Sequence, residues 1–339
     1  MWRRPLLRIM SQGGNDVLGN LRGRWREVRI TDNRGEESDT ADIVSVWRPN
    51  MPLPRKGDSF TIYLGWQDSG EVIAGTYTAQ KPNVAGGPDD GETVTVRLRA
   101  ADYIDKLKAM GREHYDRDTT FGDLMDRVAR EAGISAEVDS ELRSRKLPHV
   151  IRWDQSLIDF ATEQGDILGA TVKPMAGKLL AMKRGAARSA GGQVLEPIVI
   201  GRRGCISYEI EVEPRPIFGN VAAYWHDQRT GRRKAVKHAT GRKGPTSTLP
   251  HPYQSEEEAK AAAESRGYNL GNSSCTGRFE YPGLPSARAE APVIISGFGR
   301  DIDGTYTAET VEHSVTADGI FTTTISIGAG DKGGTEDET

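Results

Sequence analysis

The pentapeptide GTYTA stands at Gly75–Ala79 and again at Gly304–Ala308. The two copies are separated by 304 − 75 = 229 residues, far more than the roughly 20–50 residues of a solenoid repeat. Each copy follows an alternating apolar strand and precedes a second hairpin with Asp and Gly in its turn, which indicates a duplicated β domain. The alternative is that two unrelated β-meanders resemble each other. Duplication predicts that Tyr77 and Tyr306 occupy matching and equally buried positions.

Composition limits the class of protein. The 339 residues are 36% hydrophobic and 27% charged, which suits two or three globular domains. The formal net charge of −3 gives no overall attraction to nucleic acid. Cys205 and Cys275 lie far apart without CxxC spacing, so we expect neither a disulfide framework nor a zinc site. The opening MWRRPLLRIM is too short and interrupted to be a signal peptide, and we expect folding in the cytoplasm.

The chain divides into three predicted domains and a tail. Alternating apolar residues around WREVRITDNRGEESDTADIVSVW predict a β domain over residues 1–105. The period then changes, and residues 106–185 predict a small α/β module. Strand patterns return over residues 186–330, which we expect to form the second β domain. The last stretch, residues 331–339, predicts a disordered acidic tail.

Two helices and a hairpin are expected in the α/β module. In TTFGDLMDRVAREAGI the apolar residues fall at helical spacing, Thr120 and Asp123 form a cap pair, and Gly133 ends the helix. In DQSLIDFATEQGDILGA a second helix begins after Ser156. The following ATVKPMAGKLLAMKRG predicts a hairpin turning at residues 176–177.

A basic segment interrupts the second β domain at about residues 229–270. It predicts a solvated loop followed by an alanine-rich helix with Ser255 and Glu258 as its cap pair. The loop lacks interleaved aromatic residues, so specific nucleic-acid recognition is the weaker interpretation, and a transient electrostatic role with a channel or partner is favoured. Its basic residues are Arg229, Arg232, Arg233, Lys234, Lys237, Arg242 and Lys243.

Catalytic and metal chemistry are weakly supported. The chain contains no GxSxG, HExxH or GxxxxGK[ST] motif, and spacing does not fit a calcium loop. Acidic residues near the second pentapeptide lie on a turn and on successive strand positions, where solvated charge is the commoner explanation than paired acid–base catalysis. We therefore predict no enzyme, no metal and no cofactor. The candidates weighed are Asp301, Asp303, Glu309, Glu312 and His313, with scattered His114, His149, His226, His238 and His251.

Five stretches, taken in order, resemble the late control protein D family of tailed phages. They are ITDNRGEESDTADI, PLPRKGDSFTIYLGW, TTFGDLMDRVAREAG, DQSLIDFATEQGDILGATVKPMAGKLLAMKRG and SGFGRDIDGTYTAETVEHSVTADGIFTTTISI. No single stretch is a catalytic signature; their order carries the resemblance. It implies a mixed α+β, mainly β fold, with two tail-tube-like antiparallel β-barrel or sandwich domains and a small α/β insertion. The basic insert at Arg229–Pro252 has no place in the family pattern.

The resemblance also implies a function. Proteins of this family are baseplate hubs of contractile tails, located in the virion and assembled in the host cytoplasm. A homotrimer of duplicated domains matches a six-fold tail tube to a three-fold spike and leaves a channel, because three copies supply six similar domains. The implied partners are the trimeric spike, the tail tube or its initiator, wedge proteins and the tape-measure protein, with DNA only in transit and no membrane insertion. A hub of a tail-like bacteriocin or secretion-type particle is the alternative, followed by a peptidoglycan-cleaving enzyme or a nucleic-acid-binding protein.

Overall fold

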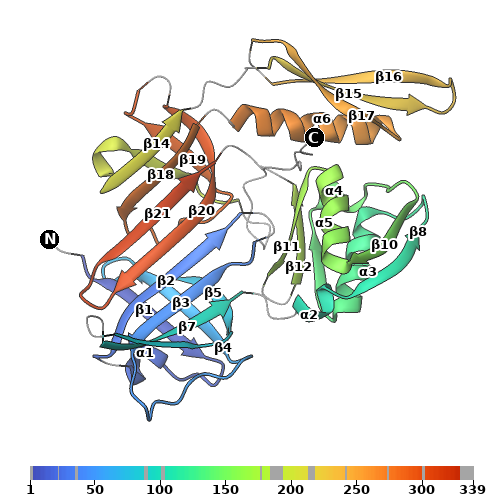
Figure 1. The fold of residues 1–339 in the computed structure, drawn as a ribbon. Coiled ribbons are helices and arrows are strands. Elements are labelled where there is room, and N and C mark those ends of the chain that lie inside the picture. Colours follow the sequence, from blue (N-terminus) through green and yellow to red (C-terminus); the bar gives the residue numbers. More distant parts are fainter. Residues whose placement is uncertain are drawn as a thin grey trace.

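The computed structural model describes residues 3–21, 23–34, 37–87, 91–100, 104–175, 178–183, 194–212, 218–240, 243–272, 275–299 and 302–328. Strands dominate these ranges and most neighbours in the sheets are antiparallel (Figure 1). The predicted mixed but mainly β fold class is therefore confirmed. In the described residues, no helix is long and apolar enough to cross a membrane.

The N-terminal strands enclose a core of alternating apolar side chains. Ile30, Ile62, Leu64 and Leu98 are almost completely buried there, while their sequence neighbours face outward because side chains alternate along a strand. A short helix, α1 (Val17–Asn20), closes one side. The strands are β1 (Pro5–Ser11), β2 (Trp25–Asn33), β3 (Thr40–Val46), β4 (Ser59–Trp66), β5 (Gly70–Ala79), β6 (Asn83–Gly87) and β7 (Gly91–Arg99).

The C-terminal strands build a second core of the same kind. Val293, Val311, Ile325 and Phe279 lie at its centre. The single-turn helix η1 (Arg202–Gly204) separates the first two strands. The strands are β13 (Ile198–Gly201), β14 (Ser207–Val212), β18 (Cys275–Pro282), β19 (Pro292–Ser296), β20 (Gly304–Thr316) and β21 (Phe321–Ile327).

The two sets of strands form one continuous 13-stranded sheet. Its main path runs β1-β4-β5-β7-β3-β2-β20-β21-β18-β14, so the join between the two halves is the antiparallel pair β2 and β20. Residues of the two halves also pack together. The ring centroids of Trp66, from the N-terminal half, and Phe321, from the C-terminal half, lie 5.1 Å apart. The Trp66 indole also donates a buried hydrogen bond to the Gly283 carbonyl. The N-terminal core is therefore completed by Val315 and Phe321 of the C-terminal strands.

The middle of the chain, called the α/β module below, contains two longer helices and several short strands. Thr120 and Asp123 make a reciprocal capping box on α3 (Phe121–Ala132), and Gly133 ends this helix in the left-handed conformation. Ser156 caps α5 (Leu157–Ile167). Both predicted helices are confirmed, whereas the 176–177 turn lies outside the described residues. The other elements are α2 (Ile104–Leu107), β8 (Met110–Tyr115), β9 (Ser135–Val138), α4 (Ser140–Arg143), β10 (Val150–Ser156), β11 (Ala170–Met175) and β12 (Lys178–Lys183).

Residues 232–239 and 246–253 of the basic insert are strands of a small sheet, so the prediction of a loop there is wrong. Strands β15 (Asn220–Asp227), β16 (Arg232–Ala239) and β17 (Thr246–Tyr253) form three neighbours in the order β16-β15-β17. The predicted helix α6 (Glu256–Asn272) packs Ala259 and Ala263 against Val221 and Ala223. The polar strands β16 and β17 form because they pair with β15 on either side. β15 is itself held in place by its apolar face, which packs against α6.

A buried ionic cluster ties the module to both halves of the large sheet. Lys173 on β11 donates 2.6 Å bonds to the Asp39 carboxylate and the Asn33 carbonyl. Asp32 lies 3.9 Å from the same ammonium and accepts a bond from the Ala289 amide of the C-terminal half. Burial and the nearby Asp39 raise the pKa of Asp32 to about 6. Three separate parts of the chain therefore meet at one lysine.

Removing this lysine should destabilise the fold strongly. Lys173→Met leaves two buried carboxylates without their cation, which costs about 3–5 kcal/mol for a broken buried pair. Lys183→Met removes an exposed pair with Glu141 and serves as the control, with an expected loss of about 0–1 kcal/mol. Urea denaturation measures both, and equal losses in the two variants would contradict the role given to Lys173.

Candidate interaction surfaces

The repeated pentapeptides pair with their neighbours in the same register. Tyr77 lies opposite Phe60 between β5 and β4, and Tyr306 lies opposite Val293 between β20 and β19. At the end of each pentapeptide, Ala79 lies opposite Leu98 whereas Ala308 lies opposite Ile327. Ala308 and Ile327 each lie 229 residues after Ala79 and Leu98, so the same strand pairing occurs at the same spacing in both halves.

The match continues into the following hairpin. Asn83 on β6 lies opposite Thr95 on β7, and Glu312 on β20 lies opposite Thr324 on β21, again at a shift of 229. The strand β6 therefore corresponds to the C-terminal half of β20. This half of β20 is the part that pairs with β2.

The two tyrosines differ in burial, so the expectation of equal burial is wrong. Tyr77 is only 2% exposed and covers Gly75, where an added Cβ would lie 2.7 Å from the hydroxyl. Tyr306 is partly buried and donates a 2.8 Å bond to the Ile302 carbonyl. The neighbours explain the difference, because Tyr77 lies in the shared core beside the Asp32–Asp39 cluster.

One strand correspondence identifies a free edge in the C-terminal half. Leu98 pairs with Ala41, which pairs with Ile30 on β2. In the second half, the corresponding Ile327 pairs with Gly277, which pairs with Ile210 on β14. β14 therefore corresponds to β2, but it ends the sheet path of the described residues, whereas β2 continues into β20.

Among the described strands, β14 and β6 each have one edge without a strand partner, and apolar side chains are exposed on both. Tyr208 on β14 is 45% exposed and Val84 on β6 is 46% exposed. Their counterparts in the joined pair, Val28 and His313, are buried. Tyr208 and Val84 are therefore exposed at positions whose counterparts are buried by the pairing of β2 with β20.

The outward face of the large sheet is polar and its charges are mutually paired. Glu312 on β20 lies 3.9 Å from Arg29 on β2 and 3.8 Å from Arg278 on β18. Arg97 pairs with Asp42 in the N-terminal half. Opposite charges alternate across strands, which leaves a hydrated face without one dominant sign.

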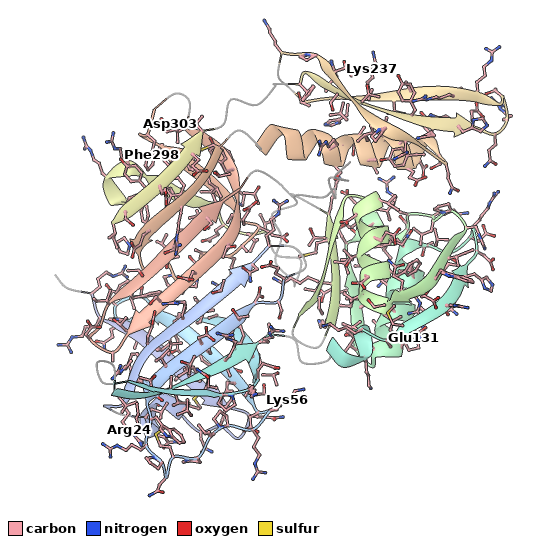
Figure 2. The ribbon with its side chains drawn as sticks, in the orientation of Figure 1. Arg24, Lys56, Glu131, Lys237, Phe298 and Asp303 are labelled. Carbon is pink, nitrogen blue, oxygen red and sulfur yellow. The ribbon has the colours of Figure 1, made fainter. Side chains whose placement is uncertain are left out.

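Among the candidates in the described residues, Asp303 and His313 have structural partners of their own, whereas His114 and His149 lie with their ring centroids 6.4 Å apart. Asp303 accepts bonds from the Phe298 and Gly299 amides and closes a turn. Figure 2 labels Asp303 and Phe298 at one end of the C-terminal strands. These bonds lower the pKa of Asp303. His313 is buried between Thr323 and the Ala287 carbonyl. Asp301 lies outside the described residues, in which no group of three metal-ligating side chains occurs.

The basic residues lie mainly on the β15–β16 hairpin. Arg229, Arg232, Arg233, Lys234, Lys237 and Lys243 are exposed, and Arg242 is outside the described residues. Figure 2 shows Lys237 on the upper sheet. Arg233 stacks 3.8 Å from the Tyr224 ring, and Lys234 lies 5.4 Å from the Trp225 ring and 2.7 Å from Asp227. Aromatic side chains therefore do lie beside the basic ones, on the neighbouring strand. They come from Tyr224 and Trp225, which directly precede the basic segment in the sequence.

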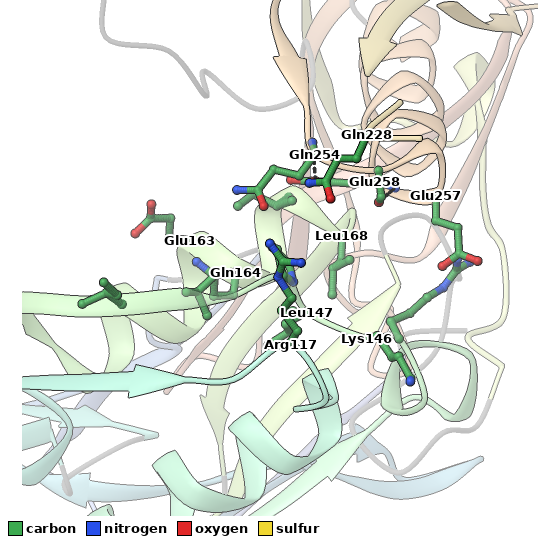
Figure 3. A pocket seen from close by; sticks show the side chains of 16 residues that line it. Arg117, Lys146, Leu147, Glu163, Gln164, Leu168, Gln228, Gln254, Glu257 and Glu258 are labelled. Atoms are coloured by element: carbon green, nitrogen blue, oxygen red, sulfur yellow. Dashed lines mark hydrogen bonds between the residues drawn. The ribbon is translucent and has the colours of Figure 1, made fainter. Parts of the chain in front are cut away.

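A pocket of about 510 Å³ opens between this unit and the α/β module (Figure 3). Module residues Arg117, Arg145 and Lys146 face it on one side, and Glu257 and Glu258 of α6 on the other. Burial raises the pKa of Glu258. The other lining residues are of both kinds: Leu147, Pro148, Val150, Ile151, Ile167 and Leu168 are apolar, whereas Glu163, Gln164, Gln228, Gln254 and Ser255 are polar.

Known structures define the class to which this fold belongs. The 43 kDa tail protein of prophage MuSo2 from Shewanella oneidensis is 13% identical, with a TM-score of 0.65 over 95% of this chain and 97% of that one. A tail protein from Neisseria meningitidis MC58 matches equally well, over 96% of both chains at 13% identity. The Escherichia coli c3393 protein, a type VI secretion component, is 10% identical. Its TM-score is 0.51 over 96% of this chain and 77% of its own. The fold is that of phage tail proteins.

Two curated relatives give the closer relationship. The probable baseplate hub protein of Escherichia phage 186 is 28% identical over 76% of this chain and 66% of the relative. The probable hub protein of Escherichia phage P2 is 30% identical over 64% of this chain and 55% of the relative. The chain spans about two thirds or less of their lengths, and no family model matches it. The chain is thus similar to two probable phage baseplate hub proteins, which confirms the resemblance seen in the sequence.

The buried histidine predicts a loss of stability in acid. Burial, with Arg288 nearby, lowers the pKa of His313 to about 3. An unfolded histidine takes up a proton near pH 6.5, so stability is lost as pH falls from about 6.5 toward 3, at about 1.4 kcal/mol per pH unit.

Comparison with His313→Gln isolates this effect. Asp32, with its raised pKa of about 6, acts in the opposite direction between about pH 4 and 6, but both proteins retain it. Urea midpoints from pH 7 to 4 should therefore fall more steeply in the wild type. Parallel pH profiles would show that His313 is protonated in the folded chain.

Proposed function

We propose that the chain is the baseplate hub of a contractile phage tail and acts as a ring-shaped trimer. The observation that carries this proposal is the repeated register of the two β halves. Within one chain, β2 of the first half pairs with β20 of the second. Repeating this join between chains pairs β14 of one copy with β6 of the next, because these strands hold the corresponding positions.

The register of the proposed join follows from the internal one. Ile30 lies opposite His313 in the chain, so Ile210 would lie opposite Val84 of the neighbouring copy. The next pair on the same face is Tyr208 opposite Gly86, where the glycine leaves room for the ring as aromatic side chains cover edge glycines. The join covers the exposed apolar groups and supplies the missing strand partners.

Three copies joined in this way supply six similar β domains and close without a free end. Such a ring presents six-fold geometry to a tail tube and three-fold geometry to a spike. The outward polar face, with its paired charges, suits the wall of a channel through which genome and protein pass. The c3393 protein is described as similar to the T4 tail proteins gp27 and gp5, which supports a place in a phage-type tail. A tail-like injection particle uses the same geometry and remains the alternative setting; wedge and tape-measure proteins complete the proposed partners.

The basic β15–β16 sheet fits an accessory electrostatic role in this assembly. Its cations are exposed, and cation–π contacts with Tyr224 and Trp225 hold two of them on the sheet. We assign them to contact with acidic protein surfaces or with passing DNA, rather than to sequence recognition, since they cover the available aromatic rings.

Substitution at either proposed edge should prevent ring formation. Val84→Asp or Tyr208→Asp places a charge in the buried centre of the join, which costs about 2 kcal/mol or more for a central interface residue. Sedimentation should give the wild type three times the chain mass of 37.1 kDa and each variant one. Ile320→Asp, at an exposed hairpin turn, is the control and should stay trimeric. A monomeric wild type in the presence of its spike protein would refute the proposal.

Loss of the acidic candidates should leave function intact. The proposed hub is not an enzyme, and Glu312 is held by arginines while Asp303 closes a turn. Glu312→Gln and Asp303→Asn should therefore assemble infectious tails in near wild-type number. Peptidoglycan hydrolysis by the wild type that either variant abolishes would show a catalytic role instead.

A further inference from the structure

Strand β16 is an edge of the small sheet and presents its backbone to solvent. The sheet order β16-β15-β17 leaves its outer side without a strand partner in the described residues. Figure 1 shows this side facing away from the α/β module. All eight residues of β16 pair with β15 without a shift in register, so the edge is regular. A regular unpaired edge can accept a further strand.

The hydrogen bonds of β16 show which of its backbone groups point outward. The Thr240 amide donates to the carbonyl of Gly219, which lies directly opposite. Hydrogen-bonded and non-hydrogen-bonded pairs alternate along an antiparallel ladder. The amides and carbonyls of Arg233, Ala235 and Lys237 therefore point away from β15. Ala235 is exposed at the centre of this set, so the backbone there is open to a partner.

The cations of β16 lie on both faces of the strand. Val236 packs with the α6 core, so Arg233 and Lys237 lie on the opposite, open face because side chains alternate along a strand. In the part of the chain that the structure describes, neither of these two cations forms an ion pair. Lys234, on the α6 face, is bonded to Asp227 at 2.7 Å. The open face therefore carries the unneutralised charge.

The two edges of the small sheet are protected in different ways. The other edge strand, β17, contains Pro250 and Pro252, which lack the amide that strand pairing requires. β16 contains neither proline nor an acidic residue, and its protection is charge alone, from Arg232, Arg233, Lys234 and Lys237. Like charges directly opposite each other destabilise a strand pair. The edge therefore disfavours a second copy of itself but attracts an acidic strand.

We propose that the β16 edge binds an extended acidic segment of a partner protein as a fourth strand of the small sheet. The proposal rests on the electrostatic role proposed above for this sheet and not on the ring. In an antiparallel addition, the residues opposite Lys237 and Arg233 lie four apart, about 13 Å from each other on the open face, and we expect them to be acidic. The Tyr224 ring, 3.8 Å from Arg233, holds that guanidinium ready for a carboxylate. DNA is disfavoured because it cannot pair with the backbone edge.

Peptide binding to the full chain tests the proposal. The probe is a fluorescent peptide of alternating valine and threonine in which two threonines four residues apart are replaced by glutamate, and its affinity is measured by anisotropy. The control peptide has glutamine at both positions. We expect the glutamate peptide to bind about tenfold more tightly, since charge-assisted bonds are the stronger ones. Lys237→Glu should lower this affinity about tenfold, and lysine in place of the first glutamate should restore it.

Ala235→Pro separates strand addition from simple attraction between charges. Proline removes an outward amide but no bond to β15, so the variant should keep the wild-type denaturation midpoint while binding the peptide about tenfold more weakly. Ala235→Thr keeps the amide and should bind like the wild type.

Three results would overturn the proposal. They are equal binding by Ala235→Pro and the wild type, equal binding of the two peptides, and tighter binding of a DNA duplex than of the glutamate peptide. Sedimentation of the same samples separates this proposal from the ring. A monomeric wild type that still shows the expected peptide preferences would contradict the ring and support strand addition.

Discussion

The antiparallel pairing of β2 with β20 is the interaction on which the rest of the structure depends. It converts two β domains into one sheet and sets their relative position to a single register, in which Ile30 lies opposite His313. A slip by one residue would move Val28 and Ile30 to the polar face and would expose the core. Core packing favours the same register of β2 and β20, because Trp66 of the N-terminal half packs against Phe321 of the C-terminal half.

The buried Lys173 cluster adds a second constraint at the same junction. It connects β11 of the module with Asp39 beside β3, and with Asp32 at the end of β2. Buried ion pairs contribute little net stability compared with apolar packing, but one charge left unpaired is costly. The cluster therefore penalises any arrangement in which the module moves away from the sheet. In this way the register of the sheet and the position of the module are specified together.

The sequence predicted those features that depend on local spacing. The duplicated pentapeptide, the caps at Thr120 and Ser156 and the alanine-rich helix were recognisable because their signals lie within a few residues. Strands β16 and β17 were missed because they are polar, and they are ordered by pairing with β15, which packs against α6. The different burial of Tyr77 and Tyr306 could not be predicted from two identical pentapeptides. It arises from neighbours contributed by distant segments, and the same is true of the Lys173 cluster and the free β14 edge.

The repeated register leads to a specific expectation for the assembled ring. Cryo-electron microscopy of the purified hub, at a resolution that shows side chains, would reveal which strands join adjacent copies. We predict antiparallel pairing of β14 with β6, with Ile210 opposite Val84 and Glu211 opposite Asn83 of the neighbouring copy. A ring joined through other strands, or through these strands in another register, would contradict the equivalence of the internal and intermolecular joins.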